Sequence, residues 1–188
     1  MNDLRGHFYL FYVGDFNAMK KFFAVVISVI ALLNFDVGNA LEAAYYEDNV
    51  NDGSSLEKAY IINSTEDFRL MRDRVNDGSD GKGKYYKLNS NIDITSDTEW
   101  VGIDGFSGYF DGQKHTINVN INRDYFYTGI FESIYSSSAV ITNLNVVGTV
   151  KGTWAGGIVW SLSAGTIENC SFTGTVEAAR AWAGGSVK

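Results

Sequence analysis

A repeat of 28 residues runs through the C-terminal half of the chain. Glycine recurs at this spacing, and an aromatic residue stands three positions before each glycine. The glycines are Gly129, Gly157 and Gly185, and the aromatic residues are Phe126, Trp154 and Trp182. Repeats of this length are typical of solenoids, in which each unit buries its apolar face against the next one. The repeat therefore predicts a stack of similar coils.

Within the repeat, short apolar strands alternate with glycine or asparagine turns from Trp100 onward. The units align on three asparagines, which are Asn118, Asn143 and Asn169. The alignment gives two apolar columns, Val119 with Leu144 and Cys170, and Ile121 with Val146 and Phe172. Apolar columns two residues apart are what a parallel β-helix needs, because inward side chains of one coil then pack on the next. The asparagines are expected to satisfy hydrogen bonds of stacked turns, which is a structural role.

One helix is expected, before the coils begin. Ser64 and Asp67 form a capping-box-like start, and Phe68, Leu70, Met71 and Val75 give the following residues an apolar face. Such a helix over 64–76 is suited to cover the open end of the first coil. No similar cover precedes Lys188, so we expect the front part of a longer array, cut at its C-terminal end and prone to self-association there.

The N-terminal region reads as an export signal. Met19-Lys20-Lys21 precedes an apolar run over 22–33, and small residues follow. A membrane anchor is the alternative, although the run is shorter than the ~20 residues that span a bilayer. The expected division of the chain is an upstream start artefact at 1–18, a signal peptide at 19–43, a linker at 44–56, an N-terminal cap at 57–99 and β-helix coils at 100–188. The mature chain is then secreted or at the cell surface, without a membrane span.

Charge and cysteine content exclude several classes of protein. The chain has 15 Lys and Arg against 22 Asp and Glu, a net charge of −7, so nucleic acid is not an expected partner. Its single cysteine, Cys170, excludes an internal disulfide framework and is expected to be a buried, inert thiol. The two histidines, His7 and His115, lack the spacing of a helical metal site, so no metal or other cofactor is expected.

Catalysis by carboxylates is a weaker expectation. A glycosidase needs two carboxyl groups that flank one bond, and a lyase would add a basic residue such as Arg123. The carboxylates nearest the expected surface are Asp104, Asp111, Asp124 and Glu132. Acidic residues in glycine-rich turns are usually turn formers, so no catalytic residue is assigned.

The aromatic column allows two interpretations. Phe126, Trp154 and Trp182 share one position of the repeat, so they would stack about 4.8 Å apart from coil to coil. They could form a packed ladder in the protein. They could also form a binding stripe for sugars, because flat rings stack on the apolar faces of pyranoses. Both interpretations stay open at the level of the sequence.

The residues from about Gly53 to Lys188 resemble the GLUG-motif proteins, which are exported bacterial proteins. The resemblance rests on 156–159, 163–170 and 172–176, and on the segment before them. Trp160 departs from it, since the motif usually closes with glycine there. The resemblance implies a right-handed parallel β-helix of the pectate-lyase-like superfamily. It also implies surface display, with a glycan or a host surface protein as partner. We therefore expect a noncatalytic module for surface adhesion or glycan contact. The alternatives are a fragment of a polysaccharide lyase or glycosidase, and a truncated remnant.

Overall fold

The computed structural model describes residues 51–180 and 183–184, without the side chains of residues 125 and 126. The expected upstream start and signal peptide lie outside these residues. The described part of the chain is mostly β and contains one helix, as the sequence predicted. None of its helices is long and apolar enough to cross a membrane.

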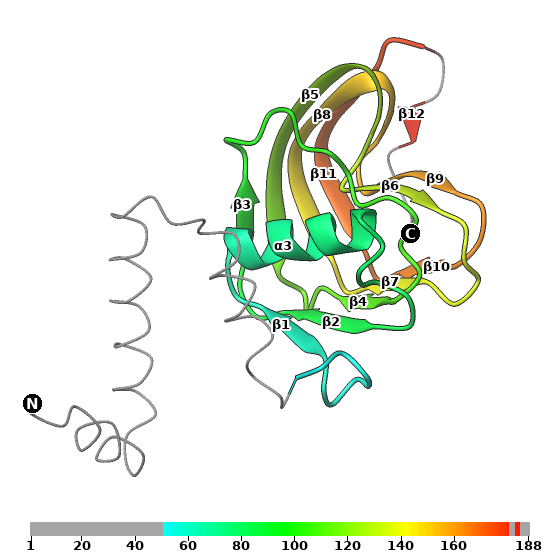
Figure 1. Cartoon of the computed structure of the whole chain (residues 1–188). Coiled ribbons are helices and arrows are strands. Elements are labelled where there is room, and N and C mark those ends of the chain that lie inside the picture. Colours follow the sequence, from blue (N-terminus) through cyan, green and yellow to red (C-terminus); the bar gives the residue numbers. More distant parts are fainter. Residues whose placement is uncertain (1–50, 181–182, 185–188) are drawn as a thin grey trace, which may run out of the picture. The chain divides into compact units, whose positions relative to one another are not determined.

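The strands form three sheets in which every described pairing is parallel (Figure 1). The first sheet contains β1 (Tyr60–Ile62), β2 (Tyr85–Leu88), β4 (Tyr109–Asp111), β7 (Val140–Thr142) and β10 (Thr166–Glu168). The second contains β3 (Ile92–Ile94), β5 (Thr116–Thr128), β8 (Asn145–Gly156) and β11 (Ser171–Ala178), and β12 (Ala183–Gly184) also pairs with β8. The third contains β6 (Phe131–Ile134) and β9 (Val159–Leu162).

The chain visits these sheets in the same order again and again. From β4 it passes to β5 and β6, and from β7 to β8 and β9, so each passage adds one strand to each sheet. The first two sheets also continue across the expected boundary at residue 99, because β2 pairs with β4 and β3 pairs with β5. The residues expected to form a separate cap thus share these sheets with the coils.

Inward side chains stack from one passage to the next. Ile117 pairs with Val146, and Ile121 pairs with Val150; all four are fully buried. Burying an aliphatic side chain of this size contributes about 1.5–3 kcal/mol. The parallel pairing therefore places a continuous apolar core behind the second sheet.

The register corrects the predicted alignment of the asparagines. Asn118 pairs with Val147 in the structure and does not align with Asn143. For the same reason Val119 and Ile121 do not share columns with Leu144 and Val146; Ile117 is the partner of Val146. The turn between β4 and β5, residues 112–115, is two residues longer than the turn between β7 and β8, so the offset between paired residues changes from 31 in β4 and β7 to 29 in β5 and β8.

The helix α3 (Thr65–Asn76) begins as the sequence predicted. The Ser64 hydroxyl accepts from the Asp67 N–H, and the Asp67 carboxylate accepts from the Ser64 N–H, at 3.1 and 3.0 Å. Its buried face contains Phe68, Met71 and Val75. The Phe68 ring stacks on Trp100, in the segment between β3 and β4, with centroids 5.2 Å apart, and it also contacts Phe110 of β4 at 6.2 Å, so buried aromatic contacts attach the helix to the rest of the domain.

Candidate functional site

Two outward aromatic side chains meet where β5 and β8 end. Tyr127 pairs with Trp154, and their ring centroids are 4.9 Å apart. The next residues along these strands, Thr128 and Ala155, are buried, so the alternation of a strand turns Tyr127 and Trp154 outward. The sequence had aligned Phe126 with Trp154. That alignment is wrong by one residue, because β5 has an irregularity between Arg123 and Tyr127.

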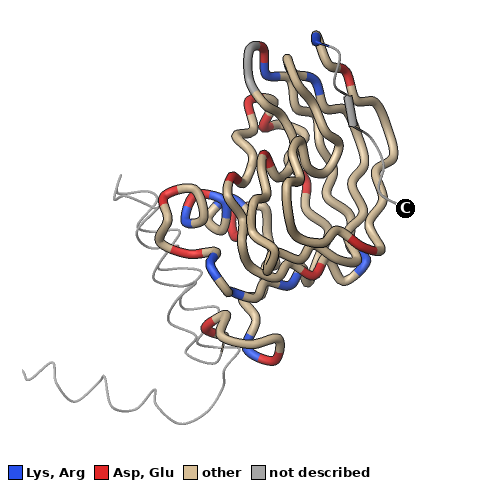
Figure 2. The backbone as a smooth tube through the Cα atoms, turned by 90° about the vertical axis from the view of Figure 1, so that its right-hand side faces the viewer, with Lys and Arg blue, Asp and Glu red and all other residues tan. Residues whose placement is uncertain are grey.

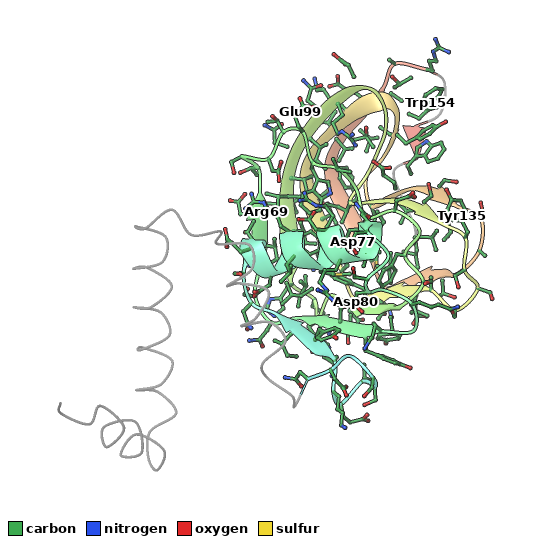
Figure 3. All side chains as sticks on the ribbon, in the orientation of Figure 1. Arg69, Asp77, Asp80, Glu99, Tyr135 and Trp154 are labelled. Atoms are coloured by element: carbon green, nitrogen blue, oxygen red, sulfur yellow. The ribbon has the colours of Figure 1, made fainter. Side chains whose placement is uncertain are left out.

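A third ring joins them from the neighbouring sheet. Trp160 of β9 stacks on Tyr127 with centroids 3.9 Å apart and an angle of 22° between the ring planes. We call Tyr127, Trp154 and Trp160 the aromatic patch. Figure 3 shows Trp154 near the end of β8, apart from Tyr135. The side chain of Phe126 and all of Trp182 lie outside the described residues.

The aromatic patch is partly open to solvent. Tyr127 is 44% exposed, and both indoles are partly buried. The guanidinium of Arg180 lies 5.8 Å from the centre of a Trp154 ring, within the range of a cation–π contact. The patch therefore combines partly exposed ring surface with a cationic group at its rim.

An ion pair lies beside the aromatic patch. Arg123 donates from Nη1 to Oε1 of Glu132 at 2.9 Å, and both side chains are largely buried. Burial raises the pKa of the Glu132 carboxyl, and the Arg123 charge opposes this rise. Glu132 stands opposite Trp160, because β6 and β9 pair Phe131 with Val159 and Ser133 with Ser161.

Among the other candidate carboxylates, Asp104 lies beside Glu132, because Ile103 bridges to Phe131, whereas Asp111 and Asp124 belong to other sheets. Asp104 is exposed, and its charge contributes to the raised pKa of Glu132. Asp111 is buried in the first sheet, where it accepts from the Gln113 N–H and from the Asn143 amide. Asp124 is exposed in β5. Within residues 51–180 and 183–184, no three His, Cys, Asp or Glu side chains are placed to hold a metal ion.

Two of the three predicted asparagines occupy equivalent turns. Asn143 and Asn169 both have φ of +53°, a left-handed conformation that Asn tolerates better than most residues. The Asn143 amide donates to Asp111 Oδ1 at 3.0 Å. The backbone conformation, which the sequence analysis had not considered, thus gives a physical reason for Asn in these turns. Asn118 lies within β5 instead.

Substitution of Asn143 separates backbone strain from hydrogen bonding. Asn143→Ala should cost about 1–2 kcal/mol for the left-handed backbone and a further ~0.5–1.5 kcal/mol for the lost bond to Asp111. Asn143→Gly should incur only the cost of the lost hydrogen bond to Asp111, because glycine tolerates the left-handed backbone. Denaturant unfolding of both variants measures the difference. An alanine variant as stable as the glycine variant would contradict this account of the turn.

The remaining reactive side chains have structural surroundings. Cys170 is buried, and burial raises the pKa of its thiol, as suits the inert thiol that the sequence predicted. His115 lies in the turn before β5, where its backbone N–H donates to the Gly112 carbonyl at 2.7 Å. Figure 2 shows acidic and basic residues interspersed along the described chain.

Sequence reasoning missed two members of the aromatic patch. In the sequence Trp160 stands out only as a departure from a motif, and the repeat does not single out Tyr127. The pairing of β5 with β8 was the missing information, because it decides which residue stands beside Trp154. The sequence did name Arg123 and Glu132, without placing them together.

Comparisons with known proteins place this region in a family of repeats. A model of the GLUG motif matches residues 154–177. Over 165 residues the chain is 28% identical to Halomucin of Haloquadratum walsbyi. The matched region covers 74% of this chain and 2% of Halomucin. The fold resembles a crystal structure from Bacteroides ovatus, provisionally named an immunoglobulin A1 protease, with a TM-score of 0.51 and 22% identity over 66% of this chain and 40% of that one. The segment that carries Trp154 and Trp160 is therefore a GLUG motif, as the sequence resemblance predicted.

Proposed function

We propose that this chain is a noncatalytic, exported module that contacts glycans at a cell surface through its aromatic patch. The observation that carries the proposal is the outward, partly exposed cluster of Tyr127, Trp154 and Trp160 within and beside the GLUG motif. Aromatic rings offer a large, rigid apolar surface at low entropic cost, and polar groups at the rim can bind hydroxyl groups.

The fold supports this proposal as a scaffold. We propose that the repeated passage through three parallel sheets is a right-handed parallel β-helix of the pectate-lyase-like type, with α3 as its N-terminal cap. Solenoids of this kind present regular outer surfaces, and a site built on paired strands is held more rigidly than one built on loops. The chain spans only a small share of Halomucin and less than half of the Bacteroides ovatus chain, so the adhesive role refers to this module alone.

One observation favours a second candidate, a polysaccharide-active enzyme. The pKa of Glu132 is raised by burial, with Asp104 as a further contributor, and raised carboxyl pKa values are found in general acids. The Arg123 partner acts in the opposite direction and stabilises the ionised form. Release of shorter chains from a polysaccharide that the protein binds would decide for the enzyme.

Affinity electrophoresis tests the role of the aromatic patch. Native gels contain xyloglucan, mixed-linkage glucan, mannan or polygalacturonate, and the full chain is compared with Trp154→Ala and Tyr127→Ala. We expect at least one polysaccharide to retain the full chain and each variant to lose that retention. The free energy of unfolding should fall by only about 0.5–1.5 kcal/mol for each ring pair removed.

Tyr135→Ala is the matched control, because Tyr135 is 62% exposed and lies outside the aromatic patch. It should keep the retention of the parent chain. A packed aromatic ladder predicts another result: no polysaccharide retains the full chain, and Trp154→Ala costs ~3–5 kcal/mol, as for a buried tryptophan. That result would reject the glycan-binding role.

A further inference from the structure

The ion pair beside the aromatic patch has no role in the stacking of the rings. Glu132 projects from β6 on the position opposite Trp160, so the two side chains share one face of the third sheet on adjacent strands. Adjacent strands lie about 4.8 Å apart. A sugar bound at the solvent-exposed part of the aromatic patch beside Trp160 would therefore bring a hydroxyl group to the carboxylate.

The carboxylate is held in place but keeps accepting capacity. Its Oε1 accepts from Arg123 at 2.9 Å, and the Gly102 backbone also bonds to the group. An ionised carboxylate has about four lone-pair sites, so it can accept further bonds from hydroxyl groups. The side chain of Glu132 is 18% exposed, which leaves it reachable from solvent.

Charge around Glu132 selects the class of glycan. The Asp104 charge acts on Glu132 as well, whereas the positive charge of Arg123 is bound in the ion pair. Arg180 lies at the other end of the patch, over Trp154. The ion pair is neutral as a whole. A uronate or sulfate oxygen at the Glu132 carboxylate would nevertheless meet only acceptor atoms, with the Asp104 charge nearby, while a neutral hydroxyl group would donate to that carboxylate.

We propose that Glu132, positioned by Arg123, binds sugar hydroxyl groups and restricts the aromatic patch to uncharged polysaccharides. The inference rests on the proposed glycan contact and names the class of glycan for the same site. Hydrogen bonds to an ionised acceptor are roughly twice as strong as neutral ones. The negative carboxylate thus favours hydroxyl donors and, by repulsion, disfavours acidic sugars.

The test compares Glu132→Gln with the full chain in native gels that contain either xyloglucan, a neutral polymer, or polygalacturonate, an anionic one. The full chain should be retained by xyloglucan and not by polygalacturonate. In Glu132→Gln the xyloglucan retention should weaken about three- to tenfold, because the charge assistance is lost, and polygalacturonate retention should appear. Glu168→Gln makes the same chemical change at an exposed position of β10 and should match the full chain.

A second variant guards against misfolding, since Glu132→Gln leaves Arg123 largely buried without its counter-charge. Asp104→Asn removes the neighbouring charge and leaves the ion pair intact. It should raise polygalacturonate retention and keep xyloglucan retention; if neither Asp104→Asn nor a folded Glu132→Gln changes the preference, the inference is overturned. Strong retention of the full chain by polygalacturonate also overturns it.

The two proposals fail in different ways. If no polysaccharide retains the full chain, the proposed glycan contact is rejected, and the role of Glu132 with it. If xyloglucan retains the full chain and Trp154→Ala loses that retention, but Glu132→Gln behaves like Glu168→Gln, only the role of Glu132 is rejected.

Discussion

Gly148→Ala should lower the free energy of unfolding by roughly 2–6 kcal/mol, the sum of a backbone cost and an overpacking cost of about 1–3 kcal/mol each. Gly148 has φ of +137°, which side chains of L residues rarely allow. A Cβ atom there would lie well inside van der Waals contact with the carbonyl oxygen of Val119 on the neighbouring strand. Because that oxygen belongs to a paired backbone, it cannot move without disturbing the pairing of β5 with β8.

Gly83→Ala is the matched control for this prediction. Gly83 also has positive φ, +68°, but a Cβ atom there would meet no atom within 4 Å. Its cost should be limited to the left-handed backbone, about 1–2 kcal/mol. Denaturant unfolding of the full chain measures both variants, and equal destabilisation by the two would contradict the close approach of the strands.

Gly174 repeats this arrangement one passage later. It has φ of +143°, and a Cβ atom there would collide with the carbonyl oxygen of Gly148, its partner in the register. Gly174 belongs to the GLUG motif, and Gly148 is its equivalent in the preceding passage. The repeat in the sequence shows that glycine recurs at this position. The close approach of stacked strands explains why it does.

The strand pattern predicted the core but could not fix the register. Asn118 was aligned four positions away from its true partner, Val147. Because side chains alternate with a period of two, a slip by four residues keeps every inward residue inward, so the apolar pattern cannot detect it. The missing information is the offset between stacked strands, which is 31 residues for β4 and β7 and 29 for β5 and β8, and which differs because the turn at residues 112–115 is two residues longer than its successor.

The candidate site was more sensitive to such errors. The offset between paired residues of β5 and β8 is 29 at Arg123 and 27 at Tyr127, so a constant repeat of 28 residues misses the true partner of Trp154 by one position, which belongs to the other face of a strand. The sequence therefore named Phe126 where the structure places Tyr127 beside Trp154. The sequence also could not predict the ion pair of Arg123 with Glu132, because it joins two strands of different sheets across the turn between them.

Trp100→Ala should also be strongly destabilising, by about 3–5 kcal/mol, because it empties the space under α3. Trp100 is fully buried, and its ring is nearly parallel to that of Phe68, with 2° between the planes. Arg72 belongs to the same helix as Phe68, and its guanidinium lies 4.4 Å from the centre of a Trp100 ring. The Trp100 Nε1 donates to the Ile130 carbonyl at 3.4 Å. One side chain thus joins the helix to the backbone of Ile130, just before β6.

Trp100→Phe separates these contributions. It keeps a ring for Phe68 and Arg72 and loses the bond to Ile130, so it should cost clearly less than the alanine variant. Hydrogen exchange gives a second measurement: in Trp100→Ala the amides of α3 should lose protection before those of β5 and β8, since the helix loses its main aromatic contact while the strand pairing stays intact. Uniform loss of protection in helix and strands would show that Trp100 supports the whole domain, and an alanine variant as stable as the phenylalanine variant would show that the stacking on Phe68 contributes little.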